Sequence, residues 1–240
     1  MGAFKRRRGE TVQRALKRVL DVGVSALGLV VLAVPFALIA LAIKLDDGGP
    51  VFFRQERVGL HGRRFRVWKF RTMVVGAEKQ GLGVTVSQND PRITRVGRFL
   101  RDFGLDELPQ LLNVLMGEMS LVGPRPTLPY QVEHYSERQR RRLTVKPGIT
   151  SLAVVSGRNA LSWRERIELD LQYIENWSLW LDLKILLKTP WVVLVKREGL
   201  YGPEGVNDPF VSPSAHQKAS QLTGKGEGER GTGERLDAKG

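Results

Sequence analysis

The chain has 240 residues, a length typical of one domain or two small ones with a real hydrophobic core. Lysine and arginine total 38 against 25 acidic residues, and the formal net charge of +13 calls for an anionic partner such as nucleic acid, a membrane surface or a phosphorylated substrate. The absence of cysteine excludes disulfides, thiolate metal sites and cysteine nucleophiles.

A long uncharged segment, 22–43, comes first in the chain. As a helix it is long enough to cross a hydrocarbon core of about 30 Å. It is also longer than the apolar region of a secretory signal peptide, which usually has about 7–15 residues, and this disfavours cleavage. Pro35 lies about two-thirds of the way along, where it would bend a helix.

The two flanks of this segment are both basic, with seven Lys and Arg residues within 5–18 and seven within 54–71. Positively charged flanks stay on the cytoplasmic side of a membrane. A re-entrant helix–break–helix would leave both ends on that side. An ordinary single span with a tolerated proline is the alternative, and these residues leave both open.

The next elements form a small hairpin and a loop. Residues 51–57 and 65–70 are rich in β-forming residues and flank Gly59-Leu-His-Gly62, which predicts a β-hairpin within 51–75. Residues 81–91 have the composition of a loop. The region after Val211 contains no aromatic residue and six glycines, as expected for a disordered tail.

Helices are predicted over most of the remaining chain. The expected ranges are 92–103, 109–116, 129–142, a helix that begins at the capping box Ser162-Trp-Arg-Glu165, and 179–195. In the first, an arginine recurs every three residues opposite an apolar face, which suits either lipid headgroups or the solvated face of a core helix. The last is strongly apolar, but three charges and Pro190 argue against a second span.

Two adjacent carboxylates, Asp106 and Glu107, are the strongest candidates for chemistry. Pro109 suits the first turn of a helix, so both carboxylates are expected at or just before its N-terminus. They either cap this helix through its dipole, or serve as a nucleophile beside a Mg²⁺ ligand.

Several cations accompany this pair. Pro124-Arg125-Pro126 fixes the backbone on both sides of one arginine, which suits capture of a phosphate, although a solvated loop arginine is the alternative. Three other cations are interpreted as structural when each is taken singly; these are Lys69, Arg71 and Arg158. Asp182 lies inside an apolar run and needs a cation, a metal or a cap as partner.

The common nucleotide and hydrolase motifs are absent, since the sequence has no GxGxxG, GxxxxGK[ST], GxSxG or HExxH. Basic residues alternate with aromatic residues over 63–70, a pattern compatible with nucleic acid. The apolar segment next to it favours lipid headgroups or phosphorylated lipids instead.

Short motifs are distributed over most of the chain. They are Lys17-Arg-Val-Leu-Asp21, Gly49-Pro-Val-Phe-Phe-Arg-Gln55, Lys69-Phe-Arg-Thr-Met73, Asn89-Asp-Pro-Arg-Ile-Thr94, Leu105-Asp-Glu-Leu-Pro-Gln-Leu-Leu-Asn-Val114, Ser120-Leu-Val-Gly-Pro-Arg-Pro126, Lys146-Pro-Gly-Ile-Thr150, Ser156-Gly-Arg-Asn159 and Leu181-Asp-Leu-Lys184. Taken together, these stretches resemble the bacterial sugar transferase family, the monotopic phosphoglycosyl transferases, in its compact form, and they occur in family order over 14–200.

The resemblance implies transfer of a sugar-1-phosphate from a UDP-sugar to undecaprenyl phosphate, with release of UMP, at the cytoplasmic face of the bacterial inner membrane. It implies that Asp106 is the nucleophile and forms a covalent phosphosugar intermediate, and that Asp106 and Glu107 hold Mg²⁺. By the same resemblance the substrate-binding residues are Lys69, Arg125, Arg158 and Asp182.

The expected fold class is α+β and mostly helical, with a membrane-embedded re-entrant helix–break–helix, amphipathic interfacial helices and a small β-hairpin. Four parts are expected: a basic amphipathic segment (1–20), the re-entrant helix (21–45), a catalytic domain (46–205) and a disordered tail (206–240). The family often bends its membrane helix at Ser-Pro, whereas this chain has Val34-Pro35 and lacks the hydroxyl that bonds back to the helix, so a genuine span stays open.

The expected partners are the UDP-sugar, undecaprenyl phosphate and membrane lipid, without nucleic acid, and the interfacial helices would allow a homodimer. Two other classes of protein compete with the enzyme. A membrane-tethered nucleic-acid-binding protein would show a steep salt dependence of DNA binding. A non-enzymatic membrane scaffold would tolerate joint substitution of Asp106, Arg125 and Arg158.

Overall fold

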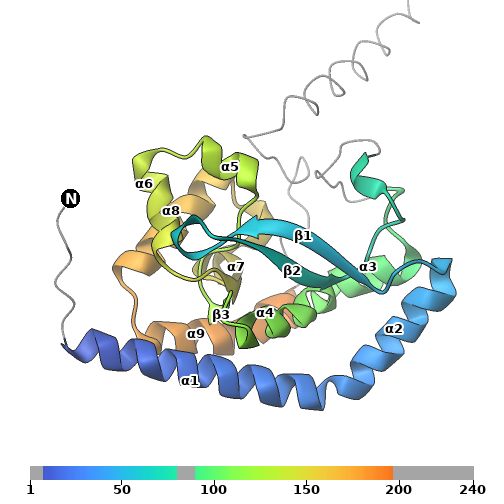
Figure 1. The fold of residues 1–240 in the computed structure, drawn as a ribbon, viewed down its shortest axis with the longest axis horizontal. Helices are drawn as coiled ribbons and strands as arrows, with labels where there is room; N and C mark the ends of the chain where they lie inside the picture. Colours follow the sequence, from blue (N-terminus) through green and yellow to red (C-terminus); the bar gives the residue numbers. More distant parts are fainter. Residues whose placement is uncertain (1–7, 80–89, 197–240) are drawn as a thin grey trace, which may run out of the picture.

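The computed structural model describes residues 8–79 and 90–196. The predicted loop 81–91 lies largely outside the described residues, as do the predicted tail 206–240 and the first seven residues of the basic segment. Two long helices, α1 (Arg8–Val31) and α2 (Ala33–Asp47), run along one edge of the molecule, and the other elements lie on one side of them (Figure 1).

The bend between α1 and α2 is 60° and lies at Leu32. Pro35 has no amide hydrogen and its ring crowds the carbonyl of Val31, so one bond of the helix ladder is missing. The neighbouring bonds, from Leu32 N to Gly28 O and from Phe36 N to Leu32 O, are kept at 2.8 Å. The bend predicted from Pro35 is therefore confirmed. In the described part of the chain no single helix is long and apolar enough to span a membrane, although the bent pair passes that test by length and composition.

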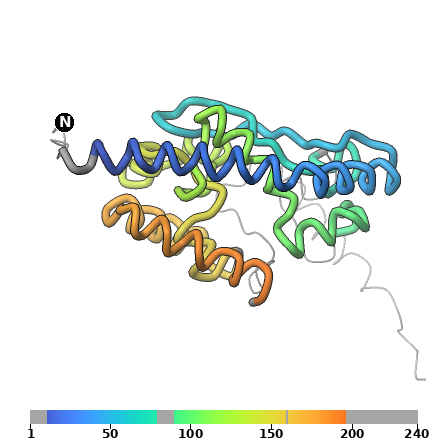
Figure 2. The backbone as a smooth tube through the Cα atoms, turned by 90° about the horizontal axis from the view of Figure 1, so that it is seen from below, coloured from blue at the N-terminus to red at the C-terminus, as the bar shows by residue number. Residues whose placement is uncertain are grey.

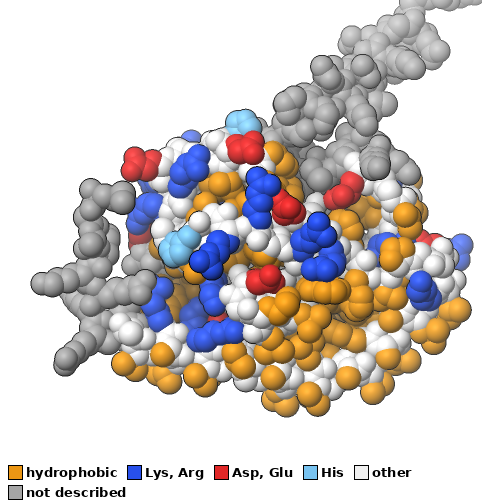
Figure 3. All heavy atoms as spheres, viewed as in Figure 1, with side chains coloured by type: hydrophobic (Ala, Val, Ile, Leu, Met, Phe, Trp, Pro, Cys, Tyr) orange, Lys and Arg blue, Asp and Glu red, His pale blue; other side chains and the backbone are white. Residues whose placement is uncertain are grey.

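Apolar side chains are exposed along this edge of the molecule (Figure 3). Seen from below, α3 (Arg95–Asp102) and α9 (Leu179–Pro190) lie beside the bent pair (Figure 2). They add Phe99, Trp180 and Leu187 to the exposed apolar surface. The apolar side chains of α1 and α2 with the highest exposed fractions are those of Val19, Leu27, Val30, Val31, Val34, Leu38 and Leu45.

The predicted hairpin is confirmed. Strands β1 (Phe52–Val58) and β2 (Arg64–Phe70) pair antiparallel, with Phe52 opposite Phe70 and Val58 opposite Arg64. Alternate residues of β2, Phe65 and Val67, are buried against the main core, as the two-residue period of a strand requires.

An ion pair and hydrogen bonds attach the end of α2 to the hairpin and to α3. Arg71, which follows β2, forms an ion pair with Asp47 and donates from Nε to the carbonyl of Pro50 at 2.6 Å. Asp46 accepts a bond from the amide of Val96 at the start of α3. The bent pair is therefore attached to the rest of the molecule at its C-terminal end, and Arg71 has the structural role expected of it.

The helices partly match their predicted ranges. Ser162 caps α8 (Trp163–Glu175) in the predicted capping box: its Oγ accepts from Glu165 N, and its own amide donates to the Glu165 carboxylate. The helix predicted at 109–116 begins instead as a 3₁₀ helix, Leu105–Gln110, followed by α4 (Leu111–Leu115). The apolar helix predicted at 179–195 is α9 followed by a π-helical turn, Trp191–Lys196.

The single helix predicted at 129–142 is wrong. The structure has α5 (Pro129–Glu133), α6 (Glu137–Arg140) and a 3₁₀ turn, Arg141–Thr144. Ser136 starts a new helix because its Oγ accepts from Gln139 N while the Gln139 side chain accepts from Ser136 N. This reciprocal capping box interrupts the helix, and the pattern Ser-x-x-Gln signals it in the sequence.

A second strand pair was not predicted. Strands β3 (Ser120–Val122) and β4 (Gly148–Thr150) pair in parallel, and α7 (Leu152–Ser156) follows β4 directly in the chain. Their backbones are so close that a Cβ on Gly148 would lie 2.1 Å from the amide nitrogen of Gly123. Three-residue strands are too short to show a two-residue period, which is why the sequence pattern missed them.

Candidate active site

The two carboxylates lie in the first turn of the 3₁₀ helix, between α3 and α4. Gly104 precedes this helix with φ of +64°, in the left-handed region, which lets the chain turn sharply out of α3. Asp106 and Glu107 therefore sit at a helix start, as the sequence predicted, although that helix is 3₁₀ in form.

Glu107 is held by two cations from other elements. Lys69 at the end of β2 donates to Oε1 at 2.7 Å, and Arg125 donates to the same oxygen at 2.7 Å and approaches Oε2 at 3.4 Å. Burial alone would raise the pKa of Glu107, but the charges of Arg125 and Lys69 outweigh it and hold the pKa well below its usual range. Glu107 is therefore an ionised carboxylate.

Asp106 is in the opposite electrostatic situation. Burial raises its pKa, the charge of Lys69 opposes this shift, and the adjacent Glu107 carboxylate adds to it. No described side chain forms a hydrogen bond or ion pair with the Asp106 carboxylate. One carboxylate of the pair is thus neutralised by protein cations, while the other is left for a ligand or a reacting atom.

The site has more cations than are needed to neutralise the two carboxylates of Asp106 and Glu107. Burial lowers the pKa of Arg158, and the charge of Glu107 opposes this shift. Its φ is +54°, a strained value outside glycine, and its buried Nη1 has no hydrogen-bond partner. Burial and the charge of Arg125 lower the pKa of Arg57 and of Arg166 to about 10. A site with this excess of positive charge suits a phosphorylated substrate.

Arg57 and Arg166 were missed by sequence reasoning. Arg57 ends a strand and Arg166 lies inside a helix, and neither has a motif around it that distinguishes it from a solvated surface arginine. Only the tertiary fold brings both next to Arg125.

The loop that carries Arg125 is held by its own carbonyl oxygens. Gly148 N donates to Pro124 O at 2.9 Å, Arg142 Nη2 to Arg125 O at 3.2 Å, and Arg57 Nη1 to Pro126 O at 3.2 Å. Arg142 is itself buried and forms an ion pair with Asp170 at 2.6 Å. The rigid presentation predicted from the two prolines is thereby reinforced.

Asn113, on α4, fixes the strand that carries Lys69. Its side chain is fully buried; Oδ1 accepts from Trp68 N at 2.9 Å, and Nδ2 donates to Arg66 O at 2.8 Å. These bonds join α4 to β2 one residue before Lys69. A buried amide with these partners connects the helix that follows the carboxylates to the strand that supplies their cation.

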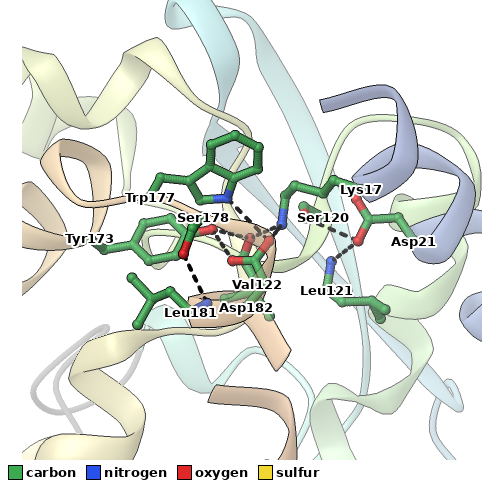
Figure 4. Close-up of polar contacts among 10 residues, drawn as sticks. All are labelled: Lys17, Asp21, Ser120, Leu121, Val122, Tyr173, Trp177, Ser178, Leu181 and Asp182. Carbon is green, nitrogen blue, oxygen red and sulfur yellow. Dashed lines mark hydrogen bonds and ion pairs between the residues drawn. The ribbon is translucent and has the colours of Figure 1, made fainter. Parts of the chain in front are cut away.

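Asp182 is not part of this cluster. It lies on α9 and pairs with Lys17 of α1 at 2.6 Å (Figure 4). The expectation that this carboxylate needs a cation is met, while its role in substrate binding stays a prediction. The structure thus brings together Asp106, Glu107, Lys69, Arg125 and Arg158, and leaves Asp182 apart.

The side chains of this site offer few ligands for a metal ion. Among the described residues no group of three or more His, Cys, Asp and Glu side chains could hold one. Mg²⁺ in phosphate sites, however, is usually bound by one or two carboxylates, with water and substrate phosphates completing the shell. The free carboxylate of Asp106 and the weakly engaged Oε2 of Glu107 fit such a partial set.

A carboxylate without a protein partner beside one neutralised by Lys69 and Arg125 is an arrangement that suits an anionic substrate. Residues 12–196 match the family described as bacterial sugar transferase, and the chain belongs to that family. The enzyme class implied by the sequence motifs is thereby confirmed.

Curated relatives support the same class. The chain is 43% identical over 212 residues to the "Uncharacterized sugar transferase EpsL" of Bacillus subtilis, with 88% of this chain and 98% of that protein covered. It is 45% identical over 191 residues to the UDP-glucose:undecaprenyl-phosphate glucose-1-phosphate transferase of Escherichia coli, covering 74% of this chain and 40% of the relative.

A third relative, the undecaprenyl-phosphate galactose phosphotransferase of Salmonella typhimurium, is 42% identical over 202 residues, which cover 78% of this chain and 42% of the relative. The chain therefore spans about two-fifths of the length of these two relatives, whose names state a reaction.

Proposed function

We propose that the chain transfers a sugar-1-phosphate from a UDP-sugar to undecaprenyl phosphate, releasing UMP and starting the assembly of an exopolysaccharide or related glycoconjugate. The observation that carries the proposal is the unequal carboxylate pair, with Glu107 neutralised by Lys69 and Arg125 and Asp106 unpaired. The family match and the reactions named for the relatives support it.

In the proposed mechanism Asp106 is a covalent nucleophile. Its carboxylate oxygen attacks the phosphorus that carries the sugar, the bond from this phosphorus to UMP breaks, and UMP leaves with the electron pair. A phosphate oxygen of undecaprenyl phosphate then attacks the same phosphorus, and the Asp106 carboxylate leaves. The two bulky substrates thus react in turn at one site, which gives ping-pong kinetics.

The cations would stabilise the charge of the transferring phosphoryl group. Arg125 and Lys69 already lie 2.7 Å from Glu107, next in sequence to the nucleophile, and the unpartnered Nη1 of Arg158 is a donor available to a phosphate oxygen. Asp106 and Glu107 would together hold Mg²⁺, which would supply charge neutralisation between the nucleophile and the phosphates.

The acceptor is a lipid, and the exposed apolar edge of the molecule supports a membrane location for the site. We propose that α1 and α2 form the re-entrant helix, because the 60° bend at Leu32 would return the chain to the side from which it entered. The exposed apolar residues of α3 and α9 would lie at the same interface, on the cytoplasmic face of the inner membrane.

The test is release of UMP from a panel of UDP-sugars in the presence of undecaprenyl phosphate and MgCl₂. We expect release with at least one UDP-sugar, a covalent adduct of sugar-phosphate mass on the peptide that contains Asp106, and loss of both with Asp106→Asn. Full turnover by Asp106→Asn, or an adduct on another residue, would refute the nucleophile assignment.

A further inference from the structure

A buried polar network joins α1 to the strand that leads into the Arg125 loop (Figure 4). Lys17 Nζ lies 2.6 Å from Asp182 Oδ2 and donates to the carbonyl oxygen of Val122 at 3.0 Å. The Lys17 side chain is 18% exposed and that of Asp182 is 7% exposed, so water screens this ion pair weakly. The Lys17 ammonium therefore contacts both Asp182 on α9 and Val122 on β3.

The carboxylate of Asp182 accepts from three protein donors. Besides Lys17, it accepts from the Tyr173 hydroxyl at 2.7 Å and from Trp177 Nε1 at 3.2 Å. Burial and the charge of Asp182 raise the pKa of Tyr173, so this hydroxyl keeps the one proton that it donates. A carboxylate satisfied in this way by three donors has little capacity left for a substrate group.

The same helix also holds the two residues before Val122. Asp21, one turn along α1 from Lys17, accepts from Ser120 Oγ at 3.1 Å and from Leu121 N at 3.0 Å. All three residues of β3 are therefore bonded to α1. The position of β3 is determined by this helix as well as by its partner strand β4.

Arg125 depends on that position, because only Gly123 and Pro124 separate it from Val122. A Cβ on Gly123 would lie 2.4 Å from the carbonyl oxygen of Lys146, so the backbone between β3 and Arg125 packs directly against that residue. The Arg125 side chain is 44% exposed, so its direction depends mainly on its backbone and on the ion pair with Glu107. A shift of β3 would therefore be transmitted to the guanidinium that faces Glu107.

We propose that Lys17 and Asp182 are positioning residues that keep β3, and hence Arg125, in the place required for phosphosugar transfer. The inference rests on the proposed function for its effect on turnover. It gives Asp182 a role through Arg125, in place of direct contact with the substrate.

The test compares variants of the full-length enzyme in lipid nanodiscs. Lys17→Met or Asp182→Asn alone leaves a buried group without its partner, and both are expected to lower Tm and kcat. The double variant K17M/D182N removes both charges, so Tm should return close to the wild-type value, since replacing both partners of a buried pair avoids an unpaired charge. Its kcat for UMP release should remain at least tenfold low, because the Val122 carbonyl has lost the Lys17 ammonium and keeps only the longer contact with the Tyr173 hydroxyl, at 3.2 Å.

Two further variants serve as references. Lys17→Arg keeps the charge and can still donate to Val122, and it should retain most of the wild-type kcat. Arg138→Met removes an exposed ion pair of the same 2.6 Å length, with Glu168, and should leave kcat and Tm unchanged.

Hydrogen exchange of the peptide 120–126 gives a readout that does not depend on activity. The double variant should exchange these amides at least tenfold faster than the wild type, while the hairpin 52–70 is unchanged. Unchanged exchange in 120–126, or a double variant with both wild-type Tm and wild-type kcat, would refute the positioning role.

The kinetic pattern separates the remaining explanations. A raised KM for the UDP-sugar with unchanged kcat in Asp182→Asn and in the double variant would show that Asp182 binds substrate, against this inference. Absence of UMP release from the wild-type enzyme would overturn the proposed function, and the exchange measurement would still decide whether Lys17 and Asp182 hold β3.

Discussion

Replacement of Asn113 by aspartate is a sensitive test of how the site is built. The side chain is fully buried, and its amide nitrogen donates to Arg66 O at 2.8 Å and to Glu118 Oε2 at 2.7 Å. Asn113→Asp keeps the acceptor for Trp68 N but removes both donations and places a carboxylate against that of Glu118. The change is isosteric, so its effect is electrostatic.

The magnitude follows from these contacts. Leaving a charge buried without a partner costs about 3–5 kcal/mol. The pKa of the introduced carboxyl would be raised by burial and by the facing Glu118, so the folded state binds a proton more tightly than the unfolded state. The free energy of unfolding should then fall as pH rises from about 4, the unfolded value, and recover as the solution is made more acidic.

The assay is urea unfolding of the detergent-solubilised protein at pH 5 and pH 8, with Asn113→Ala as the matched control. The alanine variant leaves Trp68 N and Arg66 O without partners, at a cost of about 2–6 kcal/mol that does not depend on pH. With a slope of about 2 kcal/mol per molar urea, a loss of 4 kcal/mol lowers the midpoint by about 2 M. If the two variants showed the same dependence on pH, the reasoning about Asn113 would be wrong.

Three further predictions concern stability and shape. The Arg92 side chain lowers the pKa of the buried Asp90, so their ion pair stabilises the protein above pH of about 4. This stabilisation is lost as pH falls through the lowered pKa of Asp90. Asp90→Asn should therefore make Tm less sensitive to acid. In Gly97→Ala the new Cβ would lie 2.0 Å from the carbonyl oxygen of Thr72, and calorimetry should show a loss of about 1–3 kcal/mol. Pro35→Ala restores the missing helix bond, so spin labels on α1 and α2 should move apart as the 60° bend opens.

Each of these has a clear contrary result. The contact invoked does not act as described if one of three results is found. These are the same fall of Tm at low pH in Asp90→Asn as in the wild type, a Gly97→Ala protein as stable as the wild type, or an unaltered distance between the labels in Pro35→Ala. A matched control for the last is Val34→Ala, which leaves the helix ladder untouched.

Local features were predictable because their causes lie within a few residues. Ser162 and Glu165 cap α8 by contacts three residues apart, and Pro35 bends the first helix through its own missing amide. The break at Ser136 belongs to the same class, because the capping box that causes it joins Ser136 to Gln139, three residues along the chain. These elements need no knowledge of the rest of the fold.

The family, the bend, the hairpin and the adjacent carboxylates of Asp106 and Glu107 could be inferred from the amino-acid sequence, since neighbouring residues signal each of them. The fold determined how the two carboxylates differ, because Lys69 and Arg125 reach Glu107 from distant elements and leave Asp106 unpaired. It also decided that Asp182 meets Lys17, 165 residues earlier, beside a three-residue strand with no pattern of its own. Burial and charge act through space, so a residue that reaches a carboxylate from a distant element leaves no pattern in the sequence next to that carboxylate.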